Sequence, residues 1–79
     1  MYWVYIIENP EGLYYKGYTQ NVEKRLYEHN AGESRYTSGK GPWKLVYKRS
    51  YLTKTEALKE ERRLKRLNSN SIKKLIEQG

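Results

Sequence analysis

The N-terminal end of the chain carries the pattern that most constrains the fold. Two short runs rich in β-branched and aromatic side chains, residues 2–7 and 13–18, lie on either side of an Asn-Pro-Glu-Gly segment at residues 9–12. Two such runs joined by a Pro/Gly turn predict a β-hairpin. Side chains alternate between the two faces of a strand. The positions expected to share a face are Trp3, Tyr5 and Ile7 on the first strand, and Tyr15 and Gly17 on the second.

Helical spacing follows the hairpin. Asn21 is a suitable N-cap, and Gly32 is a suitable stop. Between them, the residues that recur at the spacing of one helix face are Val22, Leu26 and His29. We therefore expect the first helix to run between Asn21 and Gly32.

A polar loop and a third strand are expected next. Residues 31–42 contain few apolar side chains, which predicts a long loop, and long loops inside compact domains are often functional. Residues 43–51 alternate between apolar and polar side chains well enough to predict a strand. Its side chains Trp43, Leu45 and Tyr47 are expected on one face.

Two helices complete the predicted fold. Thr53 and Glu56 form a capping-box signature, which opens the longest helix, and apolar positions continue to Leu67. Residues 68–71, Asn-Ser-Asn-Ser, are expected to break that helix before a short final one. The apolar positions of the final helix are Ile72, Leu75 and Ile76. The predicted order is ββαβαα, a single α/β domain over residues 1–79 in which helices flank a three-stranded, mainly antiparallel sheet.

The charge of the chain favours a polyanionic partner. Sixteen Lys and Arg residues against nine Asp and Glu residues give a net charge of +7. Basic side chains gain affinity for nucleic acid by releasing counterions from phosphates. The alternative is that the charge serves solubility alone, since +7 lies in the range suited to a small soluble domain. Nine Tyr and two Trp residues, with no Phe, supply aromatic side chains that can stack on bases or sugars.

The composition also excludes several classes of protein. The chain has no cysteine, which excludes a disulfide framework and any metal site built on thiolates. The start of the chain lacks the basic and long apolar regions of a signal peptide. No apolar run approaches the roughly 20 residues that a membrane helix needs. We therefore expect a cytoplasmic protein with no membrane partner.

Glu61 is the first residue whose position suggests chemistry. On a helical wheel it lies inside the apolar arc of the longest helix, and a carboxylate there is costly unless it is paired or bound to a metal. Hard cations such as Mg²⁺ take oxygen ligands, often one carboxylate with waters and substrate phosphate. An ion pair with a nearby Lys or Arg is an equally good explanation. Glu60 borders the same arc, and the periodicity does not choose between the two.

Arg25 and His29 are four residues apart, so they share one helix face. An arginine there can form paired hydrogen bonds to a phosphate and stabilise charge that develops at phosphorus. The alternatives are a solvated helix cation for Arg25 and a surface or helix-end histidine for His29.

Tyr5 and Tyr15 are expected to be neighbours on the hairpin. A phenol has an unperturbed pKa near ~10, so it is a poor base until a nearby cation lowers that value. The alternative is that both tyrosines only pack a half-buried sheet. Gly17 allows the backbone to pass close to a phosphate or a metal, or it simply ends a strand.

Eight short segments recur in an order that resembles one family. From the N-terminus they are Val4-Tyr5, Tyr15-Lys16-Gly17, Arg25-Leu26, His29-Asn30-Ala31-Gly32, Tyr36-Thr37, Gly41-Pro42-Trp43, Leu45-Val46-Tyr47 and Glu61-Arg62-Arg63-Leu64-Lys65. Each is weak alone, but the ordered set spans nearly the whole chain. In this set the chain resembles the GIY-YIG nuclease superfamily, and within it the small single-domain bacterial members of UPF0213 type.

The resemblance implies a metal-dependent endonuclease that hydrolyses phosphodiester bonds in nucleic acid. The expected substrate is DNA, and the expected setting is DNA repair or recombination. Glu61 is then the ligand of one Mg²⁺ or Mn²⁺ ion. Tyr15 takes a proton from the attacking water, Tyr5 positions the reacting groups, and Arg25 stabilises the transition state. His29 completes the expected catalytic set.

Nucleic-acid contacts are expected in and after the polar loop and at the end of the hairpin. The residues assigned to them are Gly17, Tyr18, Arg35, Lys40 and Lys44. A lone domain of this size has no separate targeting module, so specificity is expected to be low or to come from a protein partner.

Three departures from the family pattern keep rival functions open. The first motif, Trp3-Val4-Tyr5, lacks its glycine, and Lys16 stands where isoleucine or valine is usual. Tyr18 stands where some branches of the family place a lysine. These departures motivate a second hypothesis, a nucleic-acid-binding module of the same fold that cuts little or not at all. A third hypothesis is a protein-interaction domain that uses its aromatic surface and carries charge for solubility.

Overall fold

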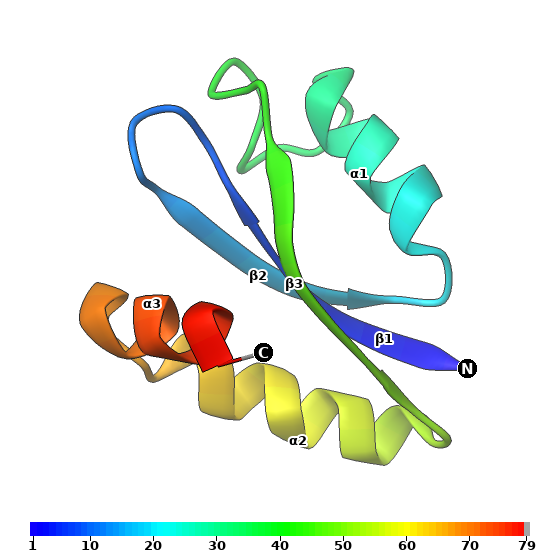
Figure 1. The fold of residues 1–79 in the computed structure, drawn as a ribbon. Helices are drawn as coiled ribbons and strands as arrows, with labels where there is room; N and C mark the ends of the chain where they lie inside the picture. The colour runs from blue at the N-terminus through cyan, green and yellow to red at the C-terminus, as the bar shows by residue number, and fades with distance from the viewer. Residues whose placement is uncertain (79) are drawn as a thin grey trace.

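The computed structural model describes residues 1–78, which form one sheet flanked by helices. In chain order the elements are β1 (Tyr2–Glu8), β2 (Tyr14–Thr19), α1 (Val22–Asn30), β3 (Lys44–Tyr51), α2 (Lys54–Lys65) and α3 (Ser69–Gln78). Both strand pairings are antiparallel, in the order β2-β1-β3. Helix α1 covers one face of the sheet, whereas α2 and α3 cover the other (Figure 1). The predicted α/β architecture and the order ββαβαα are confirmed.

β1 and β2 form the predicted hairpin. Its register pairs Tyr5 with Gly17 and Ile7 with Tyr15, so these four residues lie on one face of the sheet, as expected. We call this face the tyrosine face, and the opposite one the α2 face. The Asn9 side chain shapes the turn, because its Oδ1 accepts hydrogen bonds from two backbone N–H groups of the connection, at 3.1 and 2.8 Å.

Each face of the sheet has its own hydrophobic core. The buried residues of the α2 face are Val4, Ile6, Ala57, Leu64 and Ile72. Those of the tyrosine face are Tyr5, Ile7 and Trp43, against which the partly buried Tyr15, Leu26 and Leu45 pack. The central strand β1 is thus buried on both sides, which explains its continuous apolar run. This arrangement fixes the direction in which each β1 side chain points.

β3 departs from the predicted alternation. Leu45 pairs with Ile7 and Tyr47 pairs with Ile6, so Val46 is an extra residue that forms a β-bulge. Leu45 therefore packs on the tyrosine face, whereas Tyr47 packs on the α2 face. The expectation that Trp43, Leu45 and Tyr47 share one face is wrong for Tyr47, because the bulge shifts the alternation by one residue.

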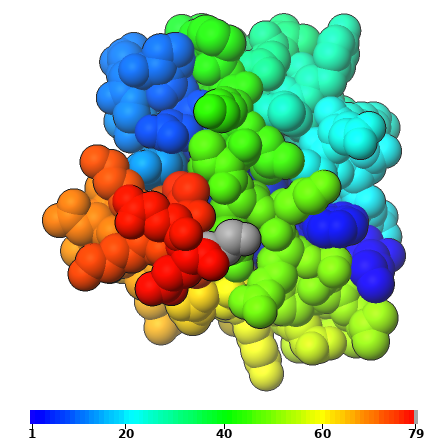
Figure 2. Space-filling view, viewed as in Figure 1, coloured from blue at the N-terminus to red at the C-terminus, as the bar shows by residue number. Residues whose placement is uncertain are grey.

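β3 is also an edge strand, and it forms the front of the molecule in the view of Figure 2, between α1 and α3. Its exposed side chains include Lys44, Lys48 and Arg49. Charged side chains on an edge strand discourage pairing with a strand of another chain. The basic residues of β3 therefore have a structural reason to be there, independent of any ligand.

The helix starts agree with the expected caps. The Asn21 side chain accepts a hydrogen bond from the Lys24 N–H, and Thr53 accepts one from the Glu56 N–H. Such caps satisfy N–H groups that lack a partner inside the helix, and each contributes about 1 kcal/mol. Helix α1 ends at Asn30, close to the expected stop.

The last two helices differ from the prediction at their junction. α2 ends at Lys65 rather than at Leu67, and α3 already begins at Ser69. The expectation that residues 68–71 separate the helices is therefore too wide. Asn68 explains the early start, because its Oδ1 accepts a hydrogen bond from the Ser71 N–H at 2.9 Å and caps the new helix.

Candidate active site

A buried chain of three polar side chains lies on the tyrosine face. The Tyr5 hydroxyl oxygen is 2.8 Å from His29 Nε2, and His29 Nδ1 is 2.7 Å from the Thr37 hydroxyl. Tyr5 is 2% exposed, and His29 and Thr37 are each 1% exposed. The three residues come from β1, from the last turn of α1 and from the loop that precedes β3. Hydrogen bonds shielded from solvent thus join side chains that are far apart in the sequence.

His29 is uncharged at neutral pH in this environment. Burial, helped by the charge of Arg25, lowers the pKa of the imidazole to about 4. A neutral imidazole carries one N–H and one unprotonated nitrogen, so one ring nitrogen donates and the other accepts. Because hydroxyl oxygens occupy both nitrogens, His29 is not free to bind a metal ion.

Tyr5, Tyr15 and His29 form a compact aromatic cluster. Their ring centroids are 6.4 Å apart for Tyr5 and Tyr15, and 4.8 Å apart for Tyr15 and His29. Burial raises the pKa of Tyr5 to about 12, and the neighbouring Tyr15 adds to this, whereas Arg25 acts in the opposite direction. Tyr5 therefore keeps its proton at neutral pH.

Gly17 provides the room that the Tyr5 ring needs. A Cβ atom added at Gly17 would lie 2.8 Å from the Tyr5 hydroxyl oxygen and 3.0 Å from its Cζ. Such distances are shorter than ordinary packing contacts, so the ring covers this glycine. The expected close approach of a phosphate at Gly17 stays a prediction, beside this structural reason for the glycine.

Arg25 is held at the edge of the cluster. One of its guanidinium nitrogens donates to Glu28 at 3.0 Å, and the Arg25 side chain remains 32% exposed. It lies close enough to Tyr5 to lower the pKa of that phenol. A partly exposed ion pair of this kind contributes little stability. Its consequence is geometric, since it keeps a cation beside the aromatic cluster.

The two glutamates of α2 differ in their surroundings. Glu60 accepts two hydrogen bonds from Arg63, at 2.6 and 2.8 Å, and that pair holds the pKa of Glu60 below its usual value. Glu61 has a looser contact, with Lys65 Nζ at 3.7 Å, and its side chain is 15% exposed. The charge of Glu61 also acts on Tyr5. Glu61 is therefore the less engaged of the two carboxylates, whereas the charge of Glu60 is balanced by Arg63.

The donor set suits a cation that brings most of its own ligands. Within residues 1–78, no three or more His, Cys, Asp or Glu side chains gather into a metal cluster. Glu61 offers a partly buried carboxylate that only Lys65 engages, at long distance. Mg²⁺ commonly binds through one or two carboxylates while waters and phosphate fill its other positions. The residues present fit such an ion, and they do not fit a fully protein-ligated one.

The residues predicted to contact nucleic acid do not form one cluster. Arg35 and Lys40 are exposed on the loop that Thr37 attaches to His29, and Lys44 is exposed at the start of β3. Tyr18 packs partly buried on the α2 face, with Lys54 Nζ 5.9 Å from its ring centroid. The loop residues thus lie on a segment tied to the cluster, whereas Tyr18 is on the opposite face from Tyr5.

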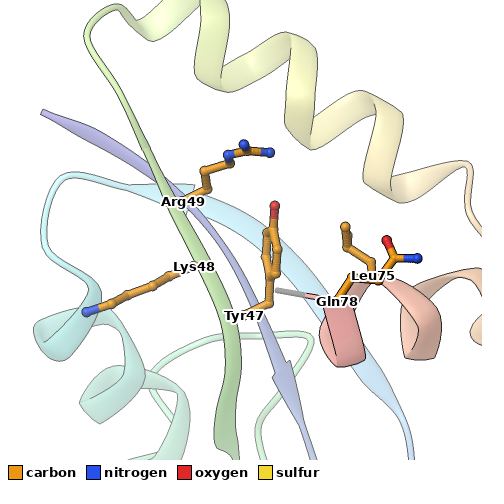
Figure 3. Close-up of a pocket in the computed structure, with 5 residues that line it drawn as sticks. All are labelled: Tyr47, Lys48, Arg49, Leu75 and Gln78. Atoms are coloured by element: carbon orange, nitrogen blue, oxygen red, sulfur yellow. The ribbon is translucent and has the colours of Figure 1, made fainter.

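A separate surface pocket lies between β3 and α3. Its lining side chains are Tyr47, Lys48, Arg49, Leu75 and Gln78 (Figure 3). Tyr47 and Arg49 point toward the helices of the α2 face, and Lys48 points the other way. The pocket is therefore across the sheet from Tyr5 and His29 and does not belong to the candidate active site.

No helix in the described part of the chain is long and apolar enough to cross a membrane.

Thr37 is the participant to which the sequence assigned no role, although it belongs to the Tyr36-Thr37 segment of the family pattern. It lies in a polar loop among several other hydroxyl residues, and nothing in the pattern marks it as buried. Three further contacts hold the loop in place, and none of them follows a regular spacing. They are the Trp43 indole N–H to the Thr37 carbonyl at 3.1 Å, the Asn30 amide to the Trp43 carbonyl at 3.1 Å, and the Asn9 amide to the Lys40 carbonyl at 3.1 Å.

Comparison with known proteins identifies the family of the chain. Residues 1–75 match the family described as the GIY-YIG catalytic domain. The chain is similar to a UPF0213 protein of Halobacterium salinarum, with 45% identity over 86% of this chain and 90% of the relative. It is also similar to a UPF0213 protein of Oceanobacillus iheyensis, with 40% identity over 96% of this chain and 90% of the relative.

A solved structure shows the same fold. The solution NMR structure of a UPF0213 protein from Bacillus halodurans superposes with a TM-score of 0.63 at 35% sequence identity. The match covers 98% of this chain and 84% of that one. The family match over nearly the full length, the UPF0213 relatives and the shared fold lead to one conclusion. The chain belongs to the GIY-YIG family, and it has the nuclease-like fold of that family's small single-domain UPF0213 members.

Proposed function

We propose that the chain is a divalent-metal-dependent endonuclease that hydrolyses phosphodiester bonds in DNA. One observation carries the proposal: Tyr5, Tyr15, Arg25 and His29 meet on the tyrosine face, and Glu61, on α2 across the sheet, is close enough for its charge to act on Tyr5. A packed sheet alone does not require two phenols, an imidazole and a guanidinium in one place. Family membership adds a nuclease-like fold.

The protein groups divide the work as follows. Tyr15 gives up its own proton to solvent before it takes one from the attacking water. Tyr5, whose pKa is raised to about 12, stays protonated and orients the reacting group through a hydrogen bond. Arg25 stabilises the negative charge that develops on the phosphate oxygens.

Glu61 would hold the metal ion. A bound Mg²⁺ or Mn²⁺ ion polarises the phosphate and neutralises the leaving oxygen. The partial burial of the Glu61 carboxylate, with one distant ammonium partner, supports this assignment. The Glu61–Lys65 contact, at 3.7 Å, would have to open to admit an ion, and the Lys65 side chain, 55% exposed, has solvent to turn into.

The substrate is held outside this centre by the basic loop and β3. Arg35, Lys40 and Lys44 are exposed, and hydrogen bonds that anchor the loop fix its position relative to His29. Contacts to phosphates give affinity without sequence information. We therefore propose low sequence specificity for a single domain over residues 1–79, with any further selectivity supplied by a protein partner. DNA repair or recombination is the setting that family membership favours.

The Glu61–Lys65 ion pair also favours a second candidate function. If the carboxylate serves only to pair with Lys65, at 3.7 Å, the domain binds nucleic acid and does not cut it. The missing glycine of the first motif and Lys16 in the second point the same way. Both functions predict binding to nucleic acid, so a binding assay does not separate them. A cleavage assay does, because only the first function predicts cleavage.

The decisive assay compares Glu61→Gln with Glu60→Gln. Both changes remove one carboxylate from the same helix, but Glu60 is already engaged by Arg63. Wild type and variants are incubated with Mg²⁺ or Mn²⁺ and with single-stranded, nicked, branched and duplex DNA, and with RNA. We expect metal-dependent cleavage by wild type and by Glu60→Gln, and none by Glu61→Gln, with binding affinity little changed.

Three outcomes would contradict the proposal. If wild type binds these substrates but cuts none of them, the binding-module function replaces it. If Glu61→Gln cuts as fast as wild type, the metal assignment is wrong. RNA cleavage without DNA cleavage would overturn the substrate.

A further inference from the structure

Thr37 lies in the Tyr36-Thr37 segment of the family pattern, but the catalytic set gives it no role. Its side chain is 1% exposed, although it belongs to a polar loop. Its hydroxyl lies 2.7 Å from His29 Nδ1, and among residues 1–78 it makes no other side-chain hydrogen bond. A buried hydroxyl that touches only a histidine must either donate its proton to that ring or leave the proton without a partner.

The two neutral tautomers of His29 leave different hydroxyl protons without a hydrogen-bond partner. With the proton on Nδ1, His29 donates to Thr37 and Tyr5 donates to Nε2, which leaves the Thr37 proton without an acceptor. With the proton on Nε2, Thr37 donates to Nδ1 and His29 donates to the Tyr5 oxygen, which leaves the Tyr5 proton free. An unsatisfied buried donor costs on the order of 1–3 kcal/mol.

The surroundings of the two hydroxyls decide between these arrangements. The Thr37 end is closed, because its neighbours in contact, His29 and Trp43, are 1% and 6% exposed. Tyr5 is itself 2% exposed, but it adjoins Arg25, whose side chain is 32% exposed and reaches solvent, whereas both neighbours of Thr37 are buried. The free proton is therefore tolerated at Tyr5 and not at Thr37.

We propose that Thr37 is a positioning residue that holds His29 in the Nε2–H tautomer and so makes Tyr5 a hydrogen-bond donor toward the substrate. His29 Nε2–H then donates to the Tyr5 oxygen, 2.8 Å away, and the Tyr5 proton is left to donate to a substrate. The part of this inference that concerns catalysis rests on the proposed nuclease function. The tautomer itself does not.

The test uses the fact that His29 is the only histidine in the sequence. Protein labelled with ¹⁵N at histidine gives one imidazole, and long-range ¹H–¹⁵N NMR spectra tell a protonated from an unprotonated ring nitrogen. We expect a single neutral tautomer at pH 7, with the proton on Nε2. A wild-type ring with its proton on Nδ1, or an equal mixture of tautomers, would overturn the proposal without any nuclease assay.

Two variants test whether Thr37 is the cause. Thr37→Val removes the hydroxyl and should convert the single tautomer into a mixture, whereas Thr37→Ser keeps the hydroxyl and should preserve it. Cleavage by Thr37→Val should lose about 10–100-fold in kcat with KM little changed, and Thr37→Ser should recover most of the loss. If Thr37→Val does not fold, the wild-type and Thr37→Ser spectra still decide the tautomer. A folded Thr37→Val protein that keeps the Nε2–H tautomer unmixed would refute the role of Thr37.

Discussion

Replacing Gly17 with alanine tests how tightly the tyrosine face is packed. The new Cβ would lie 2.8 Å from the Tyr5 hydroxyl oxygen and 3.0 Å from Cζ. Non-bonded heavy atoms pack at roughly 3.5–4.0 Å, so the ring has to move by about half an ångström or more. Tyr5 has little freedom to do so, because it is 2% exposed and its hydroxyl is 2.8 Å from His29 Nε2.

The expected loss of stability follows from two opposing effects. Overpacking a core typically costs ~1–3 kcal/mol. Alanine also restricts the unfolded chain, which stabilises the fold by ~0.4–1 kcal/mol, since Gly17 does not have the positive φ that disfavours alanine. We expect a net loss of about 1–2 kcal/mol in the free energy of unfolding. For a domain of this size that lowers Tm by roughly 4–16 °C.

Thermal melts followed by circular dichroism measure this effect, and a double variant identifies its cause. In a Tyr5→Phe background the closest atom is gone, so Gly17→Ala should cost less there than in wild type, with a measurable coupling energy. A Gly17→Ala protein that melts at or above the wild-type temperature would refute the packing argument. If that protein also binds DNA more weakly, the glycine serves phosphate approach instead.

Three further predictions concern ionisation, proton transfer and binding. Burial lowers the pKa of His29 from 6.5 to about 4, so between these pH values the unfolded chain binds more protons than the folded one. The neutral His29 therefore contributes about 3 kcal/mol to the free energy of unfolding above pH ~6.5, and this contribution is lost as the pH falls toward 4. Chemical denaturation at several pH values checks this. In His29→Gln the free energy of unfolding should no longer fall with pH over that range. Tyr15→Phe should slow single-turnover cleavage by about 10²–10⁴-fold with little change in melting, whereas Tyr14→Phe, on the α2 face, should cut normally; equal small losses would return Tyr15 to a packing role. The affinity for DNA should fall steeply with salt, by about 0.7–0.9 in log K per log unit of salt for each phosphate neutralised, and a flat profile would contradict nucleic-acid binding.

The fold was predictable where local patterns and tertiary packing agree. The hairpin, the N-caps Asn21 and Thr53 and the order of elements follow from side-chain periodicity and from turn and cap chemistry. The bulge at Val46 does not, because an extra residue in an edge strand leaves the apolar composition unchanged and only reverses the face of Tyr47. The early start of α3 was missed because Asn68 is equally suited to a loop and to a cap.

The sequence predicted which residues lie near one another in the candidate site better than it predicted the hydrogen bonds between them. Strand periodicity and the spacing of α1 predicted that Tyr5 and Tyr15 are neighbours and that Arg25 and His29 share a helix face. The hydrogen bonds that join the two groups depend on how a loop without regular periodicity folds back. Those long-range contacts bury Thr37, and a local sequence pattern does not predict them.

The central claim, that Glu61 of α2 binds a divalent ion, can be tested directly with Mn²⁺. Paramagnetic Mn²⁺ broadens the NMR signals of nearby nuclei, so titrating it into ¹⁵N-labelled protein locates the ion. We expect the strongest broadening around Glu61, extending to Gly17 and Tyr5, in wild type and in Glu60→Gln, and its loss in Glu61→Gln. Broadening centred on another carboxylate, or unchanged in Glu61→Gln, would contradict the proposed metal site and with it the proposed mechanism of cleavage.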